Sequence, residues 1–119
     1  MQDYRQIKIW QRSHRLVLEI YKLTESFPKH ELHGLTSQIR RSAYSIPMNI
    51  AEGRSKSSDS DCARFLDIAS GSAGELDYQL LLVKDLGLID SNCYSKYSSE
   101  LEEIRKMLNA YRQTILNSR

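Results

Sequence analysis

The sequence predicts an all-α fold, an antiparallel up-down-up-down four-helix bundle, on three observations. Four segments carry apolar residues at helical spacing, short polar breaks separate them, and only 5 Gly and 2 Pro occur in 119 residues. So few turn residues argue against a many-stranded β architecture. Short connections favour antiparallel neighbouring helices. We therefore expect a single bundle domain over residues 1–119, with helices at about 7–26, 30–53, 58–86 and 91–117.

The first two expected helices show apolar stripes with alternating spacings of four and three. The first ends before Pro28, because the residue preceding a proline avoids the α region. The second contains Pro47, which removes one helix hydrogen bond. Because the stripe stays in phase beyond Pro47, we expect a kinked but continuous helix, with Gly53 as its C′ residue. The stripes are Ile9, Ser13, Leu16, Ile20, Leu23 and Phe27, then Leu32, Leu35, Ile39, Ala43, Ile46 and Ile50.

The last two expected helices carry recognisable start and stop residues. Ser58 followed by Asp61 resembles a capping box, and Gly87 closes the third helix. Asp90 or Ser91 then caps the fourth. Their stripes are Leu66, Ala69, Ala73, Leu76, Leu80 and Val83, then Tyr97, Leu101, Ile104, Leu108, Tyr111 and Ile115.

Composition indicates a globular chain, with 40% hydrophobic and 27% charged residues and a net charge of +2. No run approaches the ~18 apolar residues of a membrane span, and the first residues lack the features of a signal peptide. Cys62 and Cys93 form neither a CxxC motif nor a disulfide scaffold, so we expect both to be reduced. These features predict a cytoplasmic protein with no membrane association.

Small residues at Ala69–Gly74 interrupt the third expected helix. Each interior glycine costs ~1 kcal/mol relative to alanine, so close packing against another backbone must compensate. The sequence leaves open whether that backbone belongs to the same chain or to a second subunit. Polar residues beside the stripes of the second and third helices fit either partial exposure at the edge of the bundle or a second buried seam, in which the two polar rows hydrogen-bond across two subunits. Aromatic and apolar residues outside the stripes favour the seam. The candidate oligomer-interface residues are Asn49, Glu52, Gly71, Ser72, Gly74 and Glu75.

Several motifs stand in the order seen in one protein family. They are Phe27-Pro28, Arg40-Arg41, Ser45-Ile46-Pro47, Asn49-Ile50-Ala51-Glu52-Gly53, and Gly71-Ser72 with Glu75. From about Trp10 past Ile89, the chain resembles the four-helix-bundle proteins named 23S rRNA intervening-sequence proteins, also called S23 ribosomal proteins. The resemblance implies a homopentamer without enzymatic activity. It also implies a relationship to the accessory protein of diversity-generating retroelements, which binds nucleic acid and a reverse transcriptase.

Basic residues give the first functional hypothesis. Lys8, Arg12 and Arg15 share one face of the first expected helix, opposite its apolar stripe, with Arg5 one turn earlier. Because Lys and Arg neutralise phosphates without reading sequence, we expect a non-catalytic oligomer that binds the RNA or DNA backbone. Ordinary solvated surface remains the alternative for each cation, and Arg41 has a further alternative, an ion pair with the third helix of another subunit. The candidate nucleic-acid-binding residues are Arg12, Arg15, Arg40, Arg41, Arg54, Lys56 and Arg64.

The second hypothesis is a scaffold that docks a partner protein, such as a reverse transcriptase, without touching nucleic acid. Residues 58–90 hold 2 Lys+Arg against 7 Asp+Glu and would dock a basic partner. Enzymatic activity is not expected. His30-Glu-Leu-His33 is not HExxH, no Glu-x-x-His motif of di-iron bundles occurs, and His14 lies on another helix. We expect no catalytic residues, no metal and no cofactor.

Overall fold

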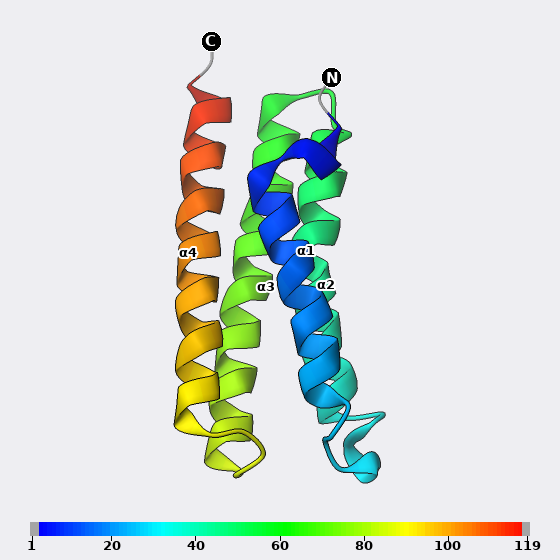
Figure 1. Cartoon of the computed structure of the whole chain (residues 1–119). Helices are drawn as coiled ribbons and strands as arrows, with labels where there is room; N and C mark the ends of the chain where they lie inside the picture. Colours follow the sequence, from blue (N-terminus) through cyan, green and yellow to red (C-terminus); the bar gives the residue numbers. More distant parts are fainter. Residues whose placement is uncertain (1–2, 118–119) are drawn as a thin grey trace.

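The computed structural model describes residues 3–117 and shows an antiparallel four-helix bundle (Figure 1). The helices are α1 (Lys8–Thr24), α2 (Leu35–Arg54), α3 (Asp59–Asp85) and α4 (Ser91–Leu116), and short 3-10 helices at Tyr4–Gln6 and Lys29–Glu31 precede α1 and α2. Successive helices reverse direction, so the start of α1 and the end of α4 lie at the same end of the molecule (Figure 1). Within residues 3–117 there is no strand, and none of the helices combines the length and apolarity needed to span a bilayer.

The predicted helix starts at Ser58 and Asp90 are confirmed. Ser58 Oγ accepts a hydrogen bond from the Asp61 N–H at 3.1 Å, and Asp90 Oδ1 accepts one from the Cys93 N–H at 2.7 Å. Each side chain thereby satisfies a backbone donor that the first helical turn leaves unpaired.

The predicted stop at Gly87 is also confirmed. Gly87 has φ of +82°, a conformation that glycine adopts without steric cost. Its N–H donates to the Lys84 carbonyl at 3.0 Å, and the Leu88 N–H donates to the Val83 carbonyl at 2.8 Å. This pair of bonds is a Schellman motif, which satisfies two of the last carbonyls of α3.

The expected start of the second helix, residue 30, is wrong. The chain forms the separate 3-10 turn at Lys29–Glu31, and Gly34 (φ −114°, ψ −108°) lies outside the helical region before α2 begins at Leu35. Leu32 fits the apolar spacing but is 47% exposed, because it belongs to the connection between α1 and α2. The first helix likewise ends at Thr24, two residues before the expected boundary at 26.

Of the two predictions made for α2, the one for Pro47 is confirmed and the one for Gly53 is wrong. The helix continues through the buried Pro47, as predicted. Gly53 is not the C′ residue, because the helix runs on to Arg54 and its C-cap is Ser55. A Cβ at Gly53 would lie 3.2 Å from the Cys62 carbonyl oxygen. Its small size therefore allows the end of α2 to lie against the start of α3.

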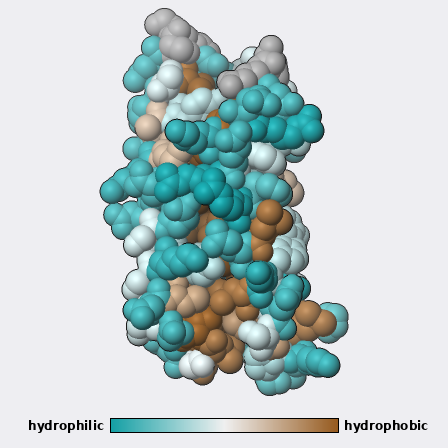
Figure 2. All heavy atoms as spheres, viewed as in Figure 1, coloured by the Kyte–Doolittle hydropathy of each residue, from teal (hydrophilic) through white to brown (hydrophobic). Residues whose placement is uncertain are grey.

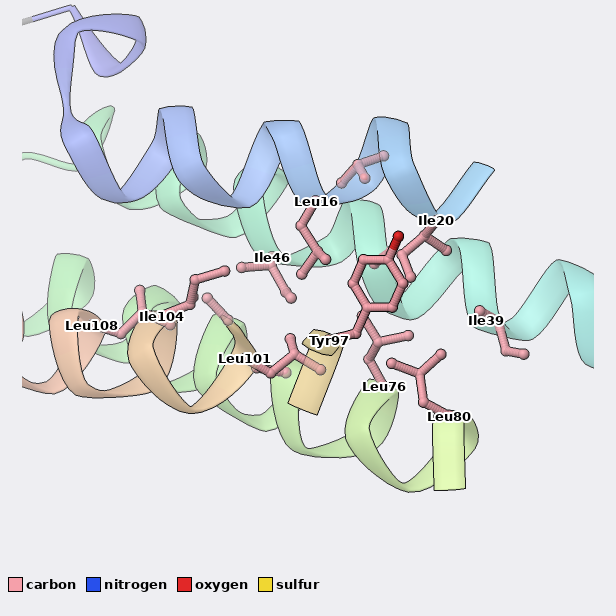
Figure 3. Packing of buried hydrophobic residues seen from close by; sticks show 14 of the residues in the cluster. Leu16, Ile20, Ile39, Ile46, Leu76, Leu80, Tyr97, Leu101, Ile104 and Leu108 are labelled. Atoms are coloured by element: carbon pink, nitrogen blue, oxygen red, sulfur yellow. The ribbon is translucent and has the colours of Figure 1, made fainter. Parts of the chain in front are cut away.

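The four predicted stripes meet in one core (Figure 3). Leu16 of α1, Ile46 of α2, Leu76 of α3 and Leu101 of α4 are each at most 1% exposed. Of the predicted stripe positions, Leu23, Leu35, Tyr111 and Ile115 are half-buried at the edge of this core, and Leu32 is outside it.

The helix pairs do not pack equally. α2 and α3 pack most extensively, followed by α3 with α4 and α1 with α2, whereas α1 and α4 approach each other at few points. In Figure 1, α3 lies between α4 and the α1–α2 pair. Only long side chains can bridge α1 and α4, and these bridges are made by charged residues.

Candidate functional site

The seven predicted nucleic-acid-binding cations lie in three places and do not form one patch. Arg12 and Arg15 are on α1, and Arg40 and Arg41 are on α2. The other three lie where α2 ends and α3 begins, at Arg54, Lys56 and Arg64.

Arg12 and Arg15 have different surroundings although they are neighbours on α1. The Arg12 guanidinium binds both carboxylate oxygens of Glu100 on α4, with Nε–Oε2 at 2.9 Å and Nη2–Oε1 at 2.8 Å. The hydrogen bond to Glu100 is the main reason that the pKa of Arg12 is raised above its ordinary value. Arg15 is exposed, and among the described residues no carboxylate pairs with it. Arg12 therefore joins α1 to α4, and Arg15 faces solvent.

Arg40 and Arg41 also differ, because one is used within the protomer and the other faces solvent. Arg40 donates from Nε to Thr24 Oγ1 at 2.8 Å, and its guanidinium lies 4.7 Å from the centre of the Tyr21 ring. It therefore joins α2 to α1. Arg41 points outward on α2, exposed and without an ion-pair partner among residues 3–117.

The end of the bundle between α2 and α3 holds the remaining three cations. Arg54 donates from Nη1 to the Tyr111 hydroxyl of α4 at 2.8 Å. Lys56 pairs with Glu52 at 3.6 Å, and Arg64 pairs with Asp61 at 3.8 Å. Lys56 and Arg64 also lie 5.0 Å and 4.6 Å from the centre of the Phe65 ring, a cation–π arrangement on both counts.

Lys22 is a further candidate nucleic-acid-binding residue, which the sequence analysis did not predict. It is exposed on α1, seven residues after Arg15, which is itself seven residues after Lys8. Seven residues make nearly two helical turns, so all three lie on one side of α1. The seven-residue spacing was the sequence signal that could have identified Lys22.

The predicted oligomer-interface residues divide between the inside and the outside of the protomer. Asn49 and Ser72 are 8% and 9% exposed, and their polar partner is within the chain. Ser45 Oγ lies 2.8 Å from Ser72 Oγ, and Asn49 Nδ2 donates to Ser45 Oγ at 2.9 Å and to the Ser45 carbonyl at 2.7 Å. The expected bonding of these two polar rows across two subunits is thus made between α2 and α3 of one chain.

The other four predicted interface residues remain at the surface. Glu52, Gly71 and Glu75 are exposed, and Gly74 is half-buried. A Cβ at Gly74 would lie 3.7–3.8 Å from the Arg105 guanidinium, whereas one at Gly71 would meet nothing within 4 Å. Packing within the chain therefore accounts for Gly74 in part and does not account for Gly71.

A groove with a volume of about 470 Å³ lies between α3 and α4. Its lining includes Arg105 and the Lys106–Glu102 pair, whose atoms are 3.4 Å apart. Asp77 also lines it and accepts a hydrogen bond from the Tyr94 hydroxyl at 3.4 Å. The lining carries two cations and two carboxylates, so this groove does not favour an anionic polymer.

The three histidines and the two cysteines lie in different surroundings. His14 stacks on Trp10, and His30 and His33 are exposed in the connection between α1 and α2. Burial raises the pKa of both the Cys62 and the Cys93 thiols, which favours the unreactive protonated form. Across residues 3–117, no three His, Cys, Asp or Glu side chains are grouped closely enough to hold a metal ion.

Comparison with known proteins identifies the family. The family model described as 23S rRNA-intervening sequence protein matches residues 5–110. A crystal structure from Bacteroides thetaiotaomicron VPI-5482, described as a protein with unknown function from the S23 ribosomal protein family, has a TM-score of 0.82 and 27% sequence identity. The similarity covers 89% of this chain and 96% of that chain. No curated protein matches the chain. The matched segment includes all of α1, α2 and α3 and most of α4, and the chain belongs to the family of 23S rRNA-intervening sequence proteins.

Proposed function

We propose that this chain is a non-catalytic, cytoplasmic, homo-oligomeric protein that associates with the phosphate backbone of RNA or DNA. The observation that carries the proposal is the division among its cations. Arg12 and Arg40 are used within the protomer, whereas Arg15 and Arg41 are exposed and unpaired among the described residues. An exposed cation without a carboxylate partner is free to neutralise a phosphate.

Exposed apolar side chains support self-association. Tyr44 and Met48 on α2 are 38% and 53% exposed, and Leu18 on α1 is 59% exposed. The core of the protomer does not include these side chains, and contact with a second copy of the chain would remove their apolar surface from water. A pentamer, as the family resemblance implies, would present each cation five times and turn a weak patch into a strong one.

The experiment is the binding of a fluorescein-labelled 20-nucleotide RNA of mixed sequence at increasing salt concentration. We expect affinity that falls steeply with salt, because bound cations release the counterions of the phosphates. Affinity that does not change with salt, or no binding at low salt, contradicts the proposal. Light scattering on the same samples reports the mass of the assembly with and without RNA.

A second candidate function is a scaffold for a basic partner protein. The surface of α3 supports it, because Tyr78 is 62% exposed on the most acidic helix, and Asp59, Asp77 and Glu75 lie on the same helix. Within α3 and its neighbours, Asp61 pairs with Arg64, Asp67 with Arg112 and Asp85 with Lys84. Association with a partner protein that survives nuclease treatment favours the scaffold, and association that nuclease abolishes favours the first function.

A further inference from the structure

We propose that a second copy of this chain docks on the outer surface that α2 and α3 form together, with α2 of one copy against α3 of the other. In this contact Arg41 of one copy pairs with Glu75 of the other. The inference rests on the proposed function, which includes self-association, and adds the surface and the ion pair that make the contact. The surface is here called the α2–α3 outer patch and consists of Arg41, Met48, Ile68 and Glu75.

The α2–α3 outer patch lies just outside the line along which the two helices touch. Ser45 of α2 and Ser72 of α3 mark this line, because their hydroxyl oxygens are 2.8 Å apart. At 3.6 residues per turn, the two patch residues on α2 lie about 40–60° around that helix from Ser45, and the two on α3 lie about 40–60° from Ser72. In both helices the rotation leads away from the core, and all four side chains are exposed. They therefore face solvent on one surface.

The charged and the apolar residues of the patch lie at two different levels along the bundle. α2 and α3 are antiparallel (Figure 1), so the hydrogen bond between the two serines fixes the register of the helices. Measured from that bond, Arg41 and Glu75 lie about 6 Å and about 4.5 Å toward one end of the bundle. Met48 and Ile68 lie about 4.5 Å and about 6 Å toward the other end. Each helix thus presents one charged and one apolar side chain at matching levels.

Both charges of the patch lack a partner in the protomer. Arg41 and Glu75 are exposed, and neither forms a hydrogen bond or an ion pair within residues 3–117. Glu52, the other carboxylate on this side of α2, pairs with Lys56 at 3.6 Å. The patch therefore carries one unpaired charge of each sign, and α2 has the positive one and α3 the negative one.

The remainder of the patch favours contact with protein. Met48 and Ile68 are 53% and 41% exposed, and burial against another chain would remove their apolar surface from water. Gln79 follows Glu75 by one turn of α3 and is 8% exposed, and its Oε1 has no hydrogen-bond partner among the described residues. Buried polar groups are rarely left unpaired, and a donor from a second copy would satisfy this oxygen.

The α2 half of the patch is complementary to the α3 half. When two copies meet through these halves with their helices pointing the same way, every residue keeps its level. Arg41 then faces Glu75 of the second copy, and Met48 faces Ile68, so that opposite charges meet and apolar side chains meet. With the helices pointing in opposite ways, each charge would face an apolar side chain. Complementarity of charge therefore favours the parallel contact, which can close a pair of copies or continue around a ring.

This contact assigns Arg41 to the ion pair between subunits and leaves the face with α1 at its front uncovered. Hydrophilic side chains cover much of the upper and middle part of that face, and apolar surface gathers toward its lower end (Figure 2). Arg15 and Lys22 of α1 are exposed. In an assembly made through the α2–α3 outer patch, these α1 cations remain accessible to RNA.

The test reverses each charge of the pair and then restores the pairing. Light scattering over a dilution series without RNA gives the assembly mass of wild type, R41E, E75R and the double variant R41E/E75R. The matched controls are E102K, K106E and E102K/K106E, which reverse an exposed pair on α4 whose atoms are 3.4 Å apart. Circular dichroism verifies that each form is folded.

We expect R41E and E75R each to raise the dissociation constant of the assembly by at least about tenfold, because like charges then meet across the contact. The double variant should return to within about threefold of wild type. An equimolar mixture of R41E and E75R should assemble where neither does alone, because the new carboxylate of one variant faces the new guanidinium of the other. The three control variants should change the dissociation constant by less than about threefold.

A second pair of variants tests the apolar level of the patch. M48S should raise the dissociation constant by about fivefold, because the apolar surface buried in the contact is lost. L86S is its matched control, since Leu86 is 57% exposed at the end of α3, away from the patch. L86S should assemble like wild type.

Different results overturn different parts of the account. Folded wild type that remains a lone protomer at every concentration overturns the proposed self-association and the inference with it. Wild-type assembly that R41E, E75R and M48S retain, or that the controls lose instead, leaves self-association standing and removes the α2–α3 outer patch. Loss of assembly in both single variants that neither the double variant nor the mixture restores removes the pairing of Arg41 with Glu75.

Discussion

The α2–α3 contact and the α1–α4 contact are made by different kinds of side chain. α2 and α3 approach closely through small residues, with Gly53 against the backbone of Cys62 and a hydrogen bond between Ser45 and Ser72. α1 and α4 are further apart and are bridged by long charged side chains, Arg12 to Glu100 and Lys96 to Glu19.

The difference in packing between these two contacts indicates which residues serve stability and which are available to a ligand. A close backbone contact admits neither water nor a ligand, so the α2–α3 contact can contribute little beyond stability. Charged bridges stay partly accessible, with the Arg12 and Glu100 side chains 32% and 30% exposed, and beside them lie cations that have no internal partner. The loosely packed side of the bundle is therefore the side that is suited to a charged ligand.

The largest expected effect comes from enlarging Gly53. In Gly53→Val the new Cβ would lie 3.2 Å from the Cys62 carbonyl oxygen and 3.3 Å from Phe65 Cβ. Because backbone must move to relieve the contact, we expect the free energy of unfolding to fall by about 2–3 kcal/mol in urea titrations. An unchanged midpoint would show that α2 and α3 are not in close contact here.

A smaller effect is expected from breaking the Arg12–Glu100 pair. Arg12→Gln and Glu100→Gln should each cost about 1 kcal/mol, with a coupling energy of about 0.5–1 kcal/mol in the double-mutant cycle, because both hydrogen bonds of a bidentate pair are lost. Lys106 and Glu102, paired at 3.4 Å with both side chains at least 68% exposed, are the matched control. Their coupling should be no more than about 0.5 kcal/mol. Equal coupling in both cycles would mean that the bridge from α1 to α4 contributes no more than an ordinary surface pair.

We also expect the free energy of unfolding to depend on alkaline pH, because Tyr97 lies beside Glu19 in the α1–α4 contact. Burial is the main cause that raises the pKa of Tyr97, and the negative charge of Glu19 adds to it. In the unfolded chain the phenol ionises near its ordinary pKa of about 10, while the folded chain still holds the proton. The contribution of Tyr97 is therefore fully present below about pH 10 and is lost as the pH rises toward its folded pKa. Urea titrations between about pH 8 and about pH 11 should show a shallower decline for Tyr97→Phe than for wild type, and superimposable profiles would contradict this cause.

The smallest effect is expected at Gly71. Gly71→Ala places a Cβ where the protomer has nothing within 4 Å, so higher helix propensity should stabilise α3 by about 0.5–1 kcal/mol. If copies of the chain meet at Gly71, as the sequence suggests, the added methyl group should also lower the assembly mass in light scattering. Destabilisation without a change in mass would contradict both expectations.

The sequence predicted the features that depend on local signals. Ser58, Asp90 and Gly87 mark helix ends because their side chain or backbone acts within a few residues along the chain. The four apolar stripes gave the core for a similar reason, since the helical period alone fixes which positions share a face.

Features that depend on contacts between helices could not be predicted in the same way. Gly53 was assigned to a helix end, but its size is needed by Cys62 and Phe65 on the next helix. The cations Arg12 and Arg15 look alike in the sequence, and only the packing of α1 beside α4 gives Arg12 a partner 88 positions away. The same packing decides which predicted nucleic-acid contacts are available and which are already used.

Light scattering of the purified protein at micromolar concentration, alone and with the labelled 20-nucleotide RNA, distinguishes an RNA-binding oligomer from a lone protomer. We expect an assembly whose mass is a multiple of the 13.8 kDa protomer and increases when RNA is added. A stable 13.8 kDa species, unaltered by RNA, would contradict it.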